Sequence, residues 1–436
     1  MEPRRYLFVM WEGGGNVPLQ LGVARKLVAR GHQVCVLTEP AVRRDVLATG
    51  ASYRWFTRAP HRQDRAREHD LVRDFDARTP IGTFAALRDR VMFGPARAYA
   101  QDTMAEIQRF RPHVLAVDWV LTGAAVAGEA ADLPTALLMH GSNPVPEPGK
   151  PPPGFGFLPA KSPLGRARDR VFTWVFLRLF NKGLPALNDA RLALGLQPLR
   201  HVLELMERPA RFLCLYSEAF DLPADRHPAH LRYVGPVLEQ PAWAEPWSPP
   251  WPPDDQRPLV VVSMSTTYMR QERVLRRCVD AIASMPVRAL VTVGPTLDPA
   301  AFHGGDNVVV VRSAPHDQVF PHASAVITHA GMGTIMRALA HGLPLLCMPQ
   351  GRDQNDVTTR VRWHGAGLRL GPRASAAKIR AALDRVLREP SFREAAQRLR
   401  QAIQADLTAD RATAELEALA HAPYPLQRAQ DQIPAE

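Results

Sequence analysis

The stretch Thr328-His329-Ala330-Gly331-Met332-Gly333-Thr334 joins a short apolar run to a helical pattern through a glycine-rich turn. The residues just before it are of strand type, and those just after it continue with helical spacing. Gly331 and Gly333 let the backbone approach a ligand, and the first free N–H groups of the helix then face an anion. His329 and Thr334 add side-chain donors. The stretch therefore predicts a diphosphate cradle, although a strand-to-helix turn also needs glycine for structural reasons alone.

A second polar loop follows that helical pattern. It comes after the apolar run 345–348 and reads Pro349-Gln350-Gly351-Arg352-Asp353-Gln354. A carboxylate beside an amide offers acceptors and donors together, in a geometry that suits a polyol. In this order, the segment 313–370 resembles the donor-binding signature of the family 1 glycosyltransferases, which include antibiotic, macrolide and plant natural-product glycosyltransferases.

The resemblance gives each matching residue an expected role. It implies that His329, Gly333 and Thr334 contact the diphosphate of a nucleotide sugar. It also implies that Asp353 and Gln354 hold the sugar hydroxyls. The expected partner at this end of the protein is therefore a nucleotide-sugar donor, with uridine and thymidine both open as the nucleoside.

Two further segments match the same family. The stretch Ser263-Met264-Ser265-Thr266 resembles a turn that gives Thr266 a phosphate-facing role, and its third residue, a serine, replaces the usual glycine. The segment 314–319 resembles the part that reads the base, which implies that backbone groups near Gln318 and Val319 pair with a pyrimidine edge.

The fold class follows from strands that alternate with helical patterns in both halves of the chain, which predicts α/β layers with parallel sheets. The expected strands lie at 6–11, 33–38, 114–118, 135–139, 212–216, 259–264, 289–293, 308–312 and 325–327. The resemblance implies the GT-B arrangement of two facing, Rossmann-like, doubly wound domains. Such sheets bind ligands at the carboxyl ends of their strands, so we expect the reaction in the cleft between the domains.

The domain boundaries rest on composition. We expect an acceptor-binding domain over 1–237 and a nucleotide-sugar-binding domain over 259–405. Between them, 238–258 holds three tryptophans and many prolines, which is typical of a linker. The last part, 406–436, is expected to return to the first domain as a helix and to end in a loose tail, as the resemblance implies.

Length and composition are compatible with this organisation. The chain has 436 residues, of which 46% are hydrophobic, enough to fill two cores. Its four cysteines lack metal-ligand spacing and fit reduced core positions, which suits the cytoplasm. The apolar run at 6–11 is too short for a signal peptide, and no run is long enough to span a bilayer. We therefore expect a cytoplasmic protein.

The net charge of +11 comes mainly from arginines spread over helical patterns, which more often marks solvated faces than a nucleic-acid groove. No nucleic-acid-binding module is recognisable, so no nucleic-acid partner is expected. A modest positive potential would still help to attract an anionic donor. The sequence leaves open whether the protein is a monomer or a homodimer.

The reaction that the resemblance implies is direct displacement at the anomeric carbon by an acceptor hydroxyl, with inversion of configuration and departure of the nucleoside diphosphate. Fixed N–H donors, His329 and Thr334 can stabilise the charge that builds on the diphosphate, so no metal or other cofactor is expected. The acceptor must also lose its proton as it attacks, which needs a positioned base.

The usual base of the family is missing here. The first-strand loop reads Trp11-Glu12-Gly13-Gly14-Gly15-Asn16, and Asn16 stands where many members carry histidine. An amide cannot accept a proton at neutral pH. Asp118 matches the carboxylate that orients that histidine, and with Asn16 beside it we expect it to take the proton itself. Alternatively, Asp118 caps the following helix and Asn16 is a polar residue near a helix start. His140 and Glu12 are lesser candidates. If no base serves, a phenol would need less help than an alcohol.

The acceptor region is expected in the loops of the first domain. The loop 140–163 is rich in proline and glycine and contains Phe155 and Phe157, which with Glu12 and His140 are the acceptor-binding candidates. The apolar stretch that follows, up to residue 180, suits a large hydrophobic aglycone, but burial as a core helix is the more usual outcome for such a stretch. Four arginines between 166 and 178 add membrane contact as a third, less favoured option.

Three functional classes remain open at this point. The first is a glycosyltransferase that acts on a hydrophobic small molecule such as a polyketide, macrolide or phenol. The second is transfer to a membrane lipid. The third is a nucleotide-sugar binder or partner protein without catalysis, which the unusual Asn16 and Ser265 suggest.

Overall fold

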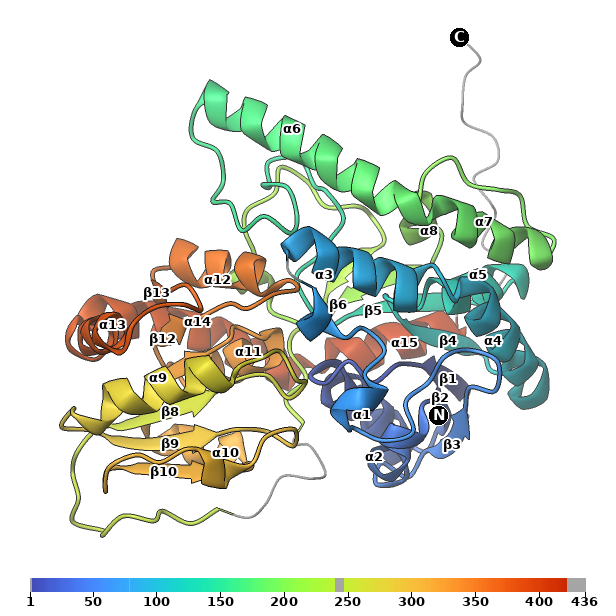
Figure 1. The fold of residues 1–436 in the computed structure, drawn as a ribbon. Coiled ribbons are helices and arrows are strands. Elements are labelled where there is room, and N and C mark those ends of the chain that lie inside the picture. Colours follow the sequence, from blue (N-terminus) through green and yellow to red (C-terminus); the bar gives the residue numbers. More distant parts are fainter. Residues whose placement is uncertain (1, 78, 240–246, 422–436) are drawn as a thin grey trace.

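The computed structural model describes residues 2–77, 79–239 and 247–421, and Figure 1 shows two sheets side by side, each flanked by helices. Residues 240–246 of the predicted linker and residues 422–436 of the predicted tail lie outside the described residues. The described residues of the linker, 238–239 and 247–258, contain no helix or strand. None of the helices in the described ranges combines the length and the apolar character needed to cross a membrane.

The first sheet is entirely parallel, with the strand order β3-β2-β1-β4-β5-β6-β7. Its strands are β1 (Arg5–Val9), β2 (Gln33–Thr38), β3 (Ser52–Trp55), β4 (Val114–Asp118), β5 (Thr135–Met139), β6 (Arg211–Cys214) and β7 (Leu231–Tyr233). The order changes direction between β1 and β4. In a doubly wound sheet that point opens a crevice at the carboxyl ends of the strands.

The second sheet is also parallel, with the order β10-β9-β8-β11-β12-β13. Its strands are β8 (Leu259–Ser263), β9 (Arg288–Thr292), β10 (Val308–Val311), β11 (Ala323–Thr328), β12 (Leu345–Cys347) and β13 (Gly367–Arg369). Its change of direction lies between β8 and β11, the two strands that lead into the predicted phosphate turns. The two doubly wound domains expected from the sequence are confirmed.

Strands covered on both faces by helices must be apolar at every position, which is why continuous apolar runs identify them. Both β4 and β5 are buried along their whole lengths, and the predicted bounds 114–118 and 135–139 are confirmed. Four observed strands lie outside the predictions: β12 does lie in an apolar run, 345–348, whereas β3, β7 and β13 lack such a run. For example, β3 reads Ser-Tyr-Arg-Trp and lies partly exposed at the sheet edge.

The chain returns to the first domain through its last described helix. The helix α14 (Pro390–Ala409) packs in the second domain, and Asp410, with φ +45°, separates it from α15 (Arg411–His421). Ala412, Leu416 and Leu419 of α15 lie in the same core cluster as the first strand. The returning helix therefore begins at Arg411, slightly later than the boundary at 406 that the sequence suggested.

The packing of α5 (Thr122–Ala130) on α4 (Ala96–Phe110) depends on one glycine. A Cβ on Gly123 would lie 1.9 Å from the backbone oxygen of Ala96, and a backbone atom cannot move aside easily. We expect Gly123→Ala to lower the free energy of unfolding by about 1–3 kcal/mol, the usual cost of overpacking. Urea denaturation followed by circular dichroism measures this. Gly371→Ala is the control, because open space surrounds that Cβ position, and an equal loss in both variants would contradict the packing explanation.

Candidate active site

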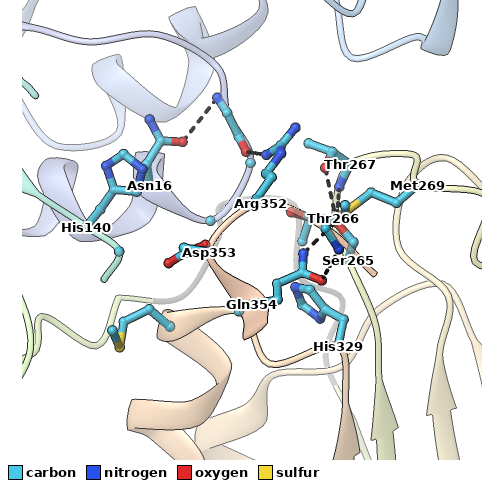
Figure 2. Close-up of a pocket in the computed structure, with 18 of the residues that line it drawn as sticks. Asn16, His140, Ser265, Thr266, Thr267, Met269, His329, Arg352, Asp353 and Gln354 are labelled. Atoms are coloured by element: carbon cyan, nitrogen blue, oxygen red, sulfur yellow. Dashed lines mark hydrogen bonds between the residues drawn. The ribbon is translucent and has the colours of Figure 1, made fainter. Parts of the chain in front are cut away.

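A cleft of about 760 Å³ lies between the two domains, bordered by loops at the carboxyl ends of β1, β5, β8, β11 and β12. Figure 2 shows Asn16 and His140 on one side of this cleft and Thr266 and His329 on the other. Asp353 projects between the two sides. The topology of both sheets thus brings the predicted donor and acceptor ends to one place.

The predicted cradle lies at the N-terminus of α11 (Met332–Ala340), where Gly331 is the N-cap. A Cβ on Gly331 would approach Nε2 of His329 to 2.5 Å, whereas a Cβ on Gly333 would meet nothing within 4 Å. Gly331 therefore makes room for the histidine, and Gly333 keeps the helix end open. Ala330 has φ +70°, which is strained for a residue with a side chain and is typical of functional turns. His329, Gly331, Gly333 and Thr334 all line the cleft.

His329 is neutral in this environment. Its ring is almost fully buried, and burial lowers its pKa to about 4, with the charge of Arg352 acting in the same direction. A hydrogen bond to the backbone of Ser263 opposes the shift without reversing it. The ring is thus held against the end of β8 with one nitrogen engaged by protein.

The loop 349–353 precedes α12 (Gln354–Trp363) and is called the sugar loop here because of its predicted role. Gln354 shapes it. Its amide oxygen accepts the backbone N–H groups of Gln350 at 2.7 Å and Gly351 at 3.1 Å. Asp353 lines the cleft, and its Oδ2 accepts the backbone N–H of Ser142 at 2.9 Å from the other domain. The predicted pair is therefore brought together, with Gln354 holding the loop and Asp353 reaching across the cleft.

Arg352 lies in the same loop and was missed by the sequence analysis. It has φ +51°, it lines the cleft, and its Nη1 donates to the backbone oxygen of Gly13 at 3.1 Å. In the sequence, Arg352 stands out only because it precedes the predicted pair Asp353 and Gln354. That position does not indicate a contact with the other domain. Arg352 places a positive charge near the cradle.

Thr266 lines the cleft as predicted. A Cβ on Gly14 would come within 2.6 Å of Oγ1 of Thr266, so the glycine loop after β1 touches the loop after β8. Ser265, which replaces the usual glycine, is also at the cleft, and its hydroxyl lies 3.0 Å from Oγ1 of Thr267. The serine is accommodated by a hydrogen bond within its own turn.

The role of backbone groups near Gln318 and Val319 in pairing with the base stays a prediction. These two residues end the short helix α10 (His316–Val319), and the N–H groups of both already donate to the oxygen of Pro315, at 2.9 and 3.2 Å. Neither residue lines the cleft. The part of this segment that does so lies earlier, at Arg312, Ser313, Ala314 and His316.

Asp118 lies beneath the cleft rather than in it. Its side chain is fully buried at the end of β4, and it is absent from the cleft lining. Its Oδ2 accepts Nδ2 of Asn16 at 2.8 Å and Nε2 of Gln20 at 2.5 Å, and its Oδ1 accepts the N–H of Val120 at 3.1 Å. The expected pair of Asn16 and Asp118 therefore exists, but the carboxylate is too deep to meet an acceptor hydroxyl itself.

Asn16 is also fully engaged. It begins α1 (Asn16–Ala29), as the alternative interpretation held, and lines the cleft. Its Oδ1 accepts the N–H of Gly13 at 3.1 Å, and its Nδ2 donates to the oxygen of Trp11 at 2.9 Å as well as to Asp118. These contacts hold the glycine loop and the carboxylate in place.

Of the acceptor candidates, Glu12, His140 and Phe155 line the cleft, whereas Phe157 does not. Phe157 packs behind it, against Phe155 and Phe172, because the loop folds back onto a helix. The carboxylate of Glu12 accepts the N–H of Gly14 at 2.8 Å and Nε of Arg65 at 2.8 Å, so it also supports the glycine loop.

Additional apolar side chains complete the acceptor end. Phe84 comes from α3 (Pro80–Leu87), Phe176 and Leu179 from α6 (Pro163–Phe180), and Trp119 follows β4. Only part of α6 is a core helix: Phe176 and Phe180 are buried, but Val171 and Trp174 are each 58% exposed. The expectation of burial was therefore wrong for the outer face of this helix.

The chain resembles known proteins in sequence and in fold. Residues 276–419 match the family described as the C-terminal domain of erythromycin biosynthesis protein CIII-like proteins. The chain is 32% identical to the 4'-demethylrebeccamycin synthase of Lentzea aerocolonigenes, over 91% of this chain and 94% of that protein.

Among solved structures, the calicheamicin glycosyltransferase CalG4 has a TM-score of 0.75 and 23% identity, with 98% of this chain and all of that chain covered. The glycosyltransferase VinC in complex with DTDP has a TM-score of 0.67 and 19% identity, covering 95% and 99% of the two chains. Together with the cradle and the two facing domains, these similarities show that the chain belongs to the family 1 glycosyltransferases with the GT-B fold.

Proposed function

We propose that this glycosyltransferase moves a sugar from a UDP- or TDP-sugar to a hydroxyl of a hydrophobic small molecule, with inversion at the anomeric carbon and without a metal. The observation that carries the proposal is that a diphosphate cradle and an apolar wall share one cleft. The natural-product enzymes that resemble the chain, one of them in complex with DTDP, support the same assignment.

The cradle supplies the stabilisation that the leaving group needs. The helix end at Gly333 and Thr334 points N–H groups into the cleft, and Arg352 adds a positive charge nearby. Donors that are fixed before the reaction stabilise developing charge without reorganisation. This is why we propose that no metal takes part. The four cysteines are free and buried, which supports our proposal that the enzyme works in the reducing cytoplasm.

The acceptor wall favours a large apolar substrate. Phe84, Trp119, Phe155 and Phe176 give the cleft aromatic surfaces opposite the donor end. Burial of such surface against a hydrophobic aglycone contributes roughly 25 cal/mol per Å². Because the cleft has a volume of about 760 Å³, it can hold a nucleotide sugar together with an acceptor of natural-product size.

The test is to incubate the purified protein with UDP- and TDP-sugars and pooled hydrophobic phenols and macrolactones. We expect a glycoside detected by mass spectrometry, release of the nucleoside diphosphate, an inverted anomeric configuration by NMR, and no loss of rate with EDTA. Reactions without acceptor measure donor hydrolysis. Donor binding without any glycoside would instead identify a nucleotide-sugar binder and overturn the catalytic assignment.

A further inference from the structure

His140 has the position of a proton acceptor in the cleft. It directly follows β5, and its ring lines the cleft with the side chain about 20% exposed. Its Nδ1 is buried and makes no regular hydrogen bond, although it lies 3.4 Å from Oδ2 of Asp118. Neighbouring parallel strands place these two residues together, because β4 ends at Asp118 and pairs with β5.

The carboxylate of Asp118 is held entirely by neutral donors. The donors that contact the fully buried carboxylate are the amides of Asn16 and Gln20 and the backbone of Val120, all of them neutral. Neutral donors fix the carboxylate without cancelling its charge. A carboxylate held in this way orients an imidazole through Nδ1 and stabilises the imidazolium that forms when the other nitrogen takes a proton.

The chain next to His140 touches the sugar loop. The N–H of Ser142 donates to Asp353, and a Cβ on Gly141 would come within 2.6 Å of Oδ2 of the same carboxylate. A sugar held by Asp353 therefore lies beside His140. The ring of His140 and the apolar side chains of Trp119 and Phe155 line the same cleft.

We propose that His140 is the general base of this enzyme, with Asp118 as its positioning residue and Asn16 as the side chain that holds Asp118. This rests on the proposed function. The acceptor O–H gives its proton to Nε2 of His140, and the oxygen forms the new bond to the anomeric carbon. The bond from that carbon to the diphosphate breaks, and its electron pair leaves with the nucleoside diphosphate. The histidine thus comes from the end of β5 instead of the loop after β1.

The closing experiment compares wild type, His140→Ala and His140→Gln on acceptors of graded acidity, from aliphatic alcohols to nitrophenols. For aliphatic alcohols we expect kcat to fall by about 10²–10⁴, the usual contribution of a general base. The loss should shrink as the acceptor becomes more acidic, because an acidic hydroxyl needs less help. Titration with the nucleoside diphosphate should give the same Kd for all three proteins, which shows that the variants fold.

Added imidazole provides a readout that a structural role would not move. It should restore part of the His140→Ala rate, because the small base can occupy the vacated space. Asp118→Asn should lower kcat at least about tenfold with little change in acceptor KM, and imidazole should not restore it.

Equal losses on alcohols and nitrophenols, or activity in His140→Ala within about threefold of wild type, would overturn the role of His140. If wild type itself transfers no sugar, the proposed function fails, and this inference fails with it.

Discussion

Replacement of His329 by alanine is expected to lower kcat by about 10²–10³, the usual cost of removing one fixed donor to a developing anion. The reason lies in the two nitrogens of its ring. One is engaged with the backbone of Ser263, and burial lowers the pKa to about 4, so the ring is neutral before the donor binds. A diphosphate in the cradle brings negative charge to the second nitrogen and raises that pKa. The imidazolium can then donate to protein and ligand together.

This predicts that the donor binds together with a proton. The pKa of His329 is about 4 in the free protein and is higher when the donor is bound. The affinity that the protonated ring adds for the donor is therefore present below the higher pKa and is lost as the pH rises through it. Calorimetry of TDP binding in buffers of different ionisation enthalpy measures the proton uptake. His329→Ala should remove it, and the comparison cancels the titration of the ligand itself.

The control is His303→Ala, an exposed histidine of the same domain. We expect its kcat and proton uptake to equal those of wild type. Proton uptake that persists unchanged in His329→Ala would contradict the role of the ring, and a kcat within threefold of wild type would contradict its contribution to catalysis.

The turn that forms the predicted cradle could be located from the sequence because it is local. The cradle is one strand-to-helix turn, so the seven residues 328–334 specify both the geometry and the donors. The strands were predictable because a parallel sheet covered on both faces requires continuous apolar runs. Short or polar edge strands such as β3 carry no such signal.

The catalytic side was only partly predictable. The pairing of Asn16 with Asp118 followed from the family pattern, and the structure has it at 2.8 Å. Burial decided the rest, since a fully buried carboxylate cannot reach an acceptor, whereas the ring of His140 at the end of the next strand lines the cleft. Contacts between domains, such as that of Ser142 with Asp353, join positions 211 residues apart. No local sequence pattern predicts such a contact.

The second large effect is expected at Asp221, where the two domains share a buried ion pair. Its Oδ1 lies 2.7 Å from Nε of Arg360 on α12, and its Oδ2 accepts Nζ of Lys150 at 2.9 Å. Tyr216 and Tyr233 also donate to Oδ2. Burial alone would raise the pKa of Asp221, but the charges of Arg360 and Lys150 outweigh it, so the pKa falls well below its usual range.

Asp221→Asn keeps the shape of the side chain but removes the carboxylate charge that the buried Arg360 and Lys150 share, and it leaves Lys150 paired with Glu147 alone. We expect a loss of about 3–5 kcal/mol in the free energy of unfolding at pH 7. A depressed carboxyl pKa contributes stability that is complete above the unfolded value, near 3.9, and is lost as the pH falls through the folded value. The difference between wild type and variant should therefore be full at pH 7 and shrink below about pH 4.

Urea midpoints across this pH range measure the effect, and Asp189→Asn is the control. Asp189 and Arg97 are both more than half exposed at 3.4 Å, so that variant should cost less than about 1 kcal/mol at any pH. If the difference in the free energy of unfolding between wild type and Asp221→Asn stays constant down to acid pH, the carboxylate charge is not the source of that difference.

The same variant should weaken donor binding, because α12 carries the sugar loop at its start. Asp353 precedes the helix, and Asp356 within it accepts the N–H groups of Gly154 and Gly156 from the first domain. Arg360, one turn further on, is the anchor that Asp221 holds. When that anchor is lost, only Asp356 and the contact of Asp353 with Ser142 still hold this end of α12 to the first domain, so Asp353 is positioned less firmly. We therefore expect a higher donor KM in Asp221→Asn at temperatures where the protein is still folded, whereas loss of the base at His140 changes kcat alone.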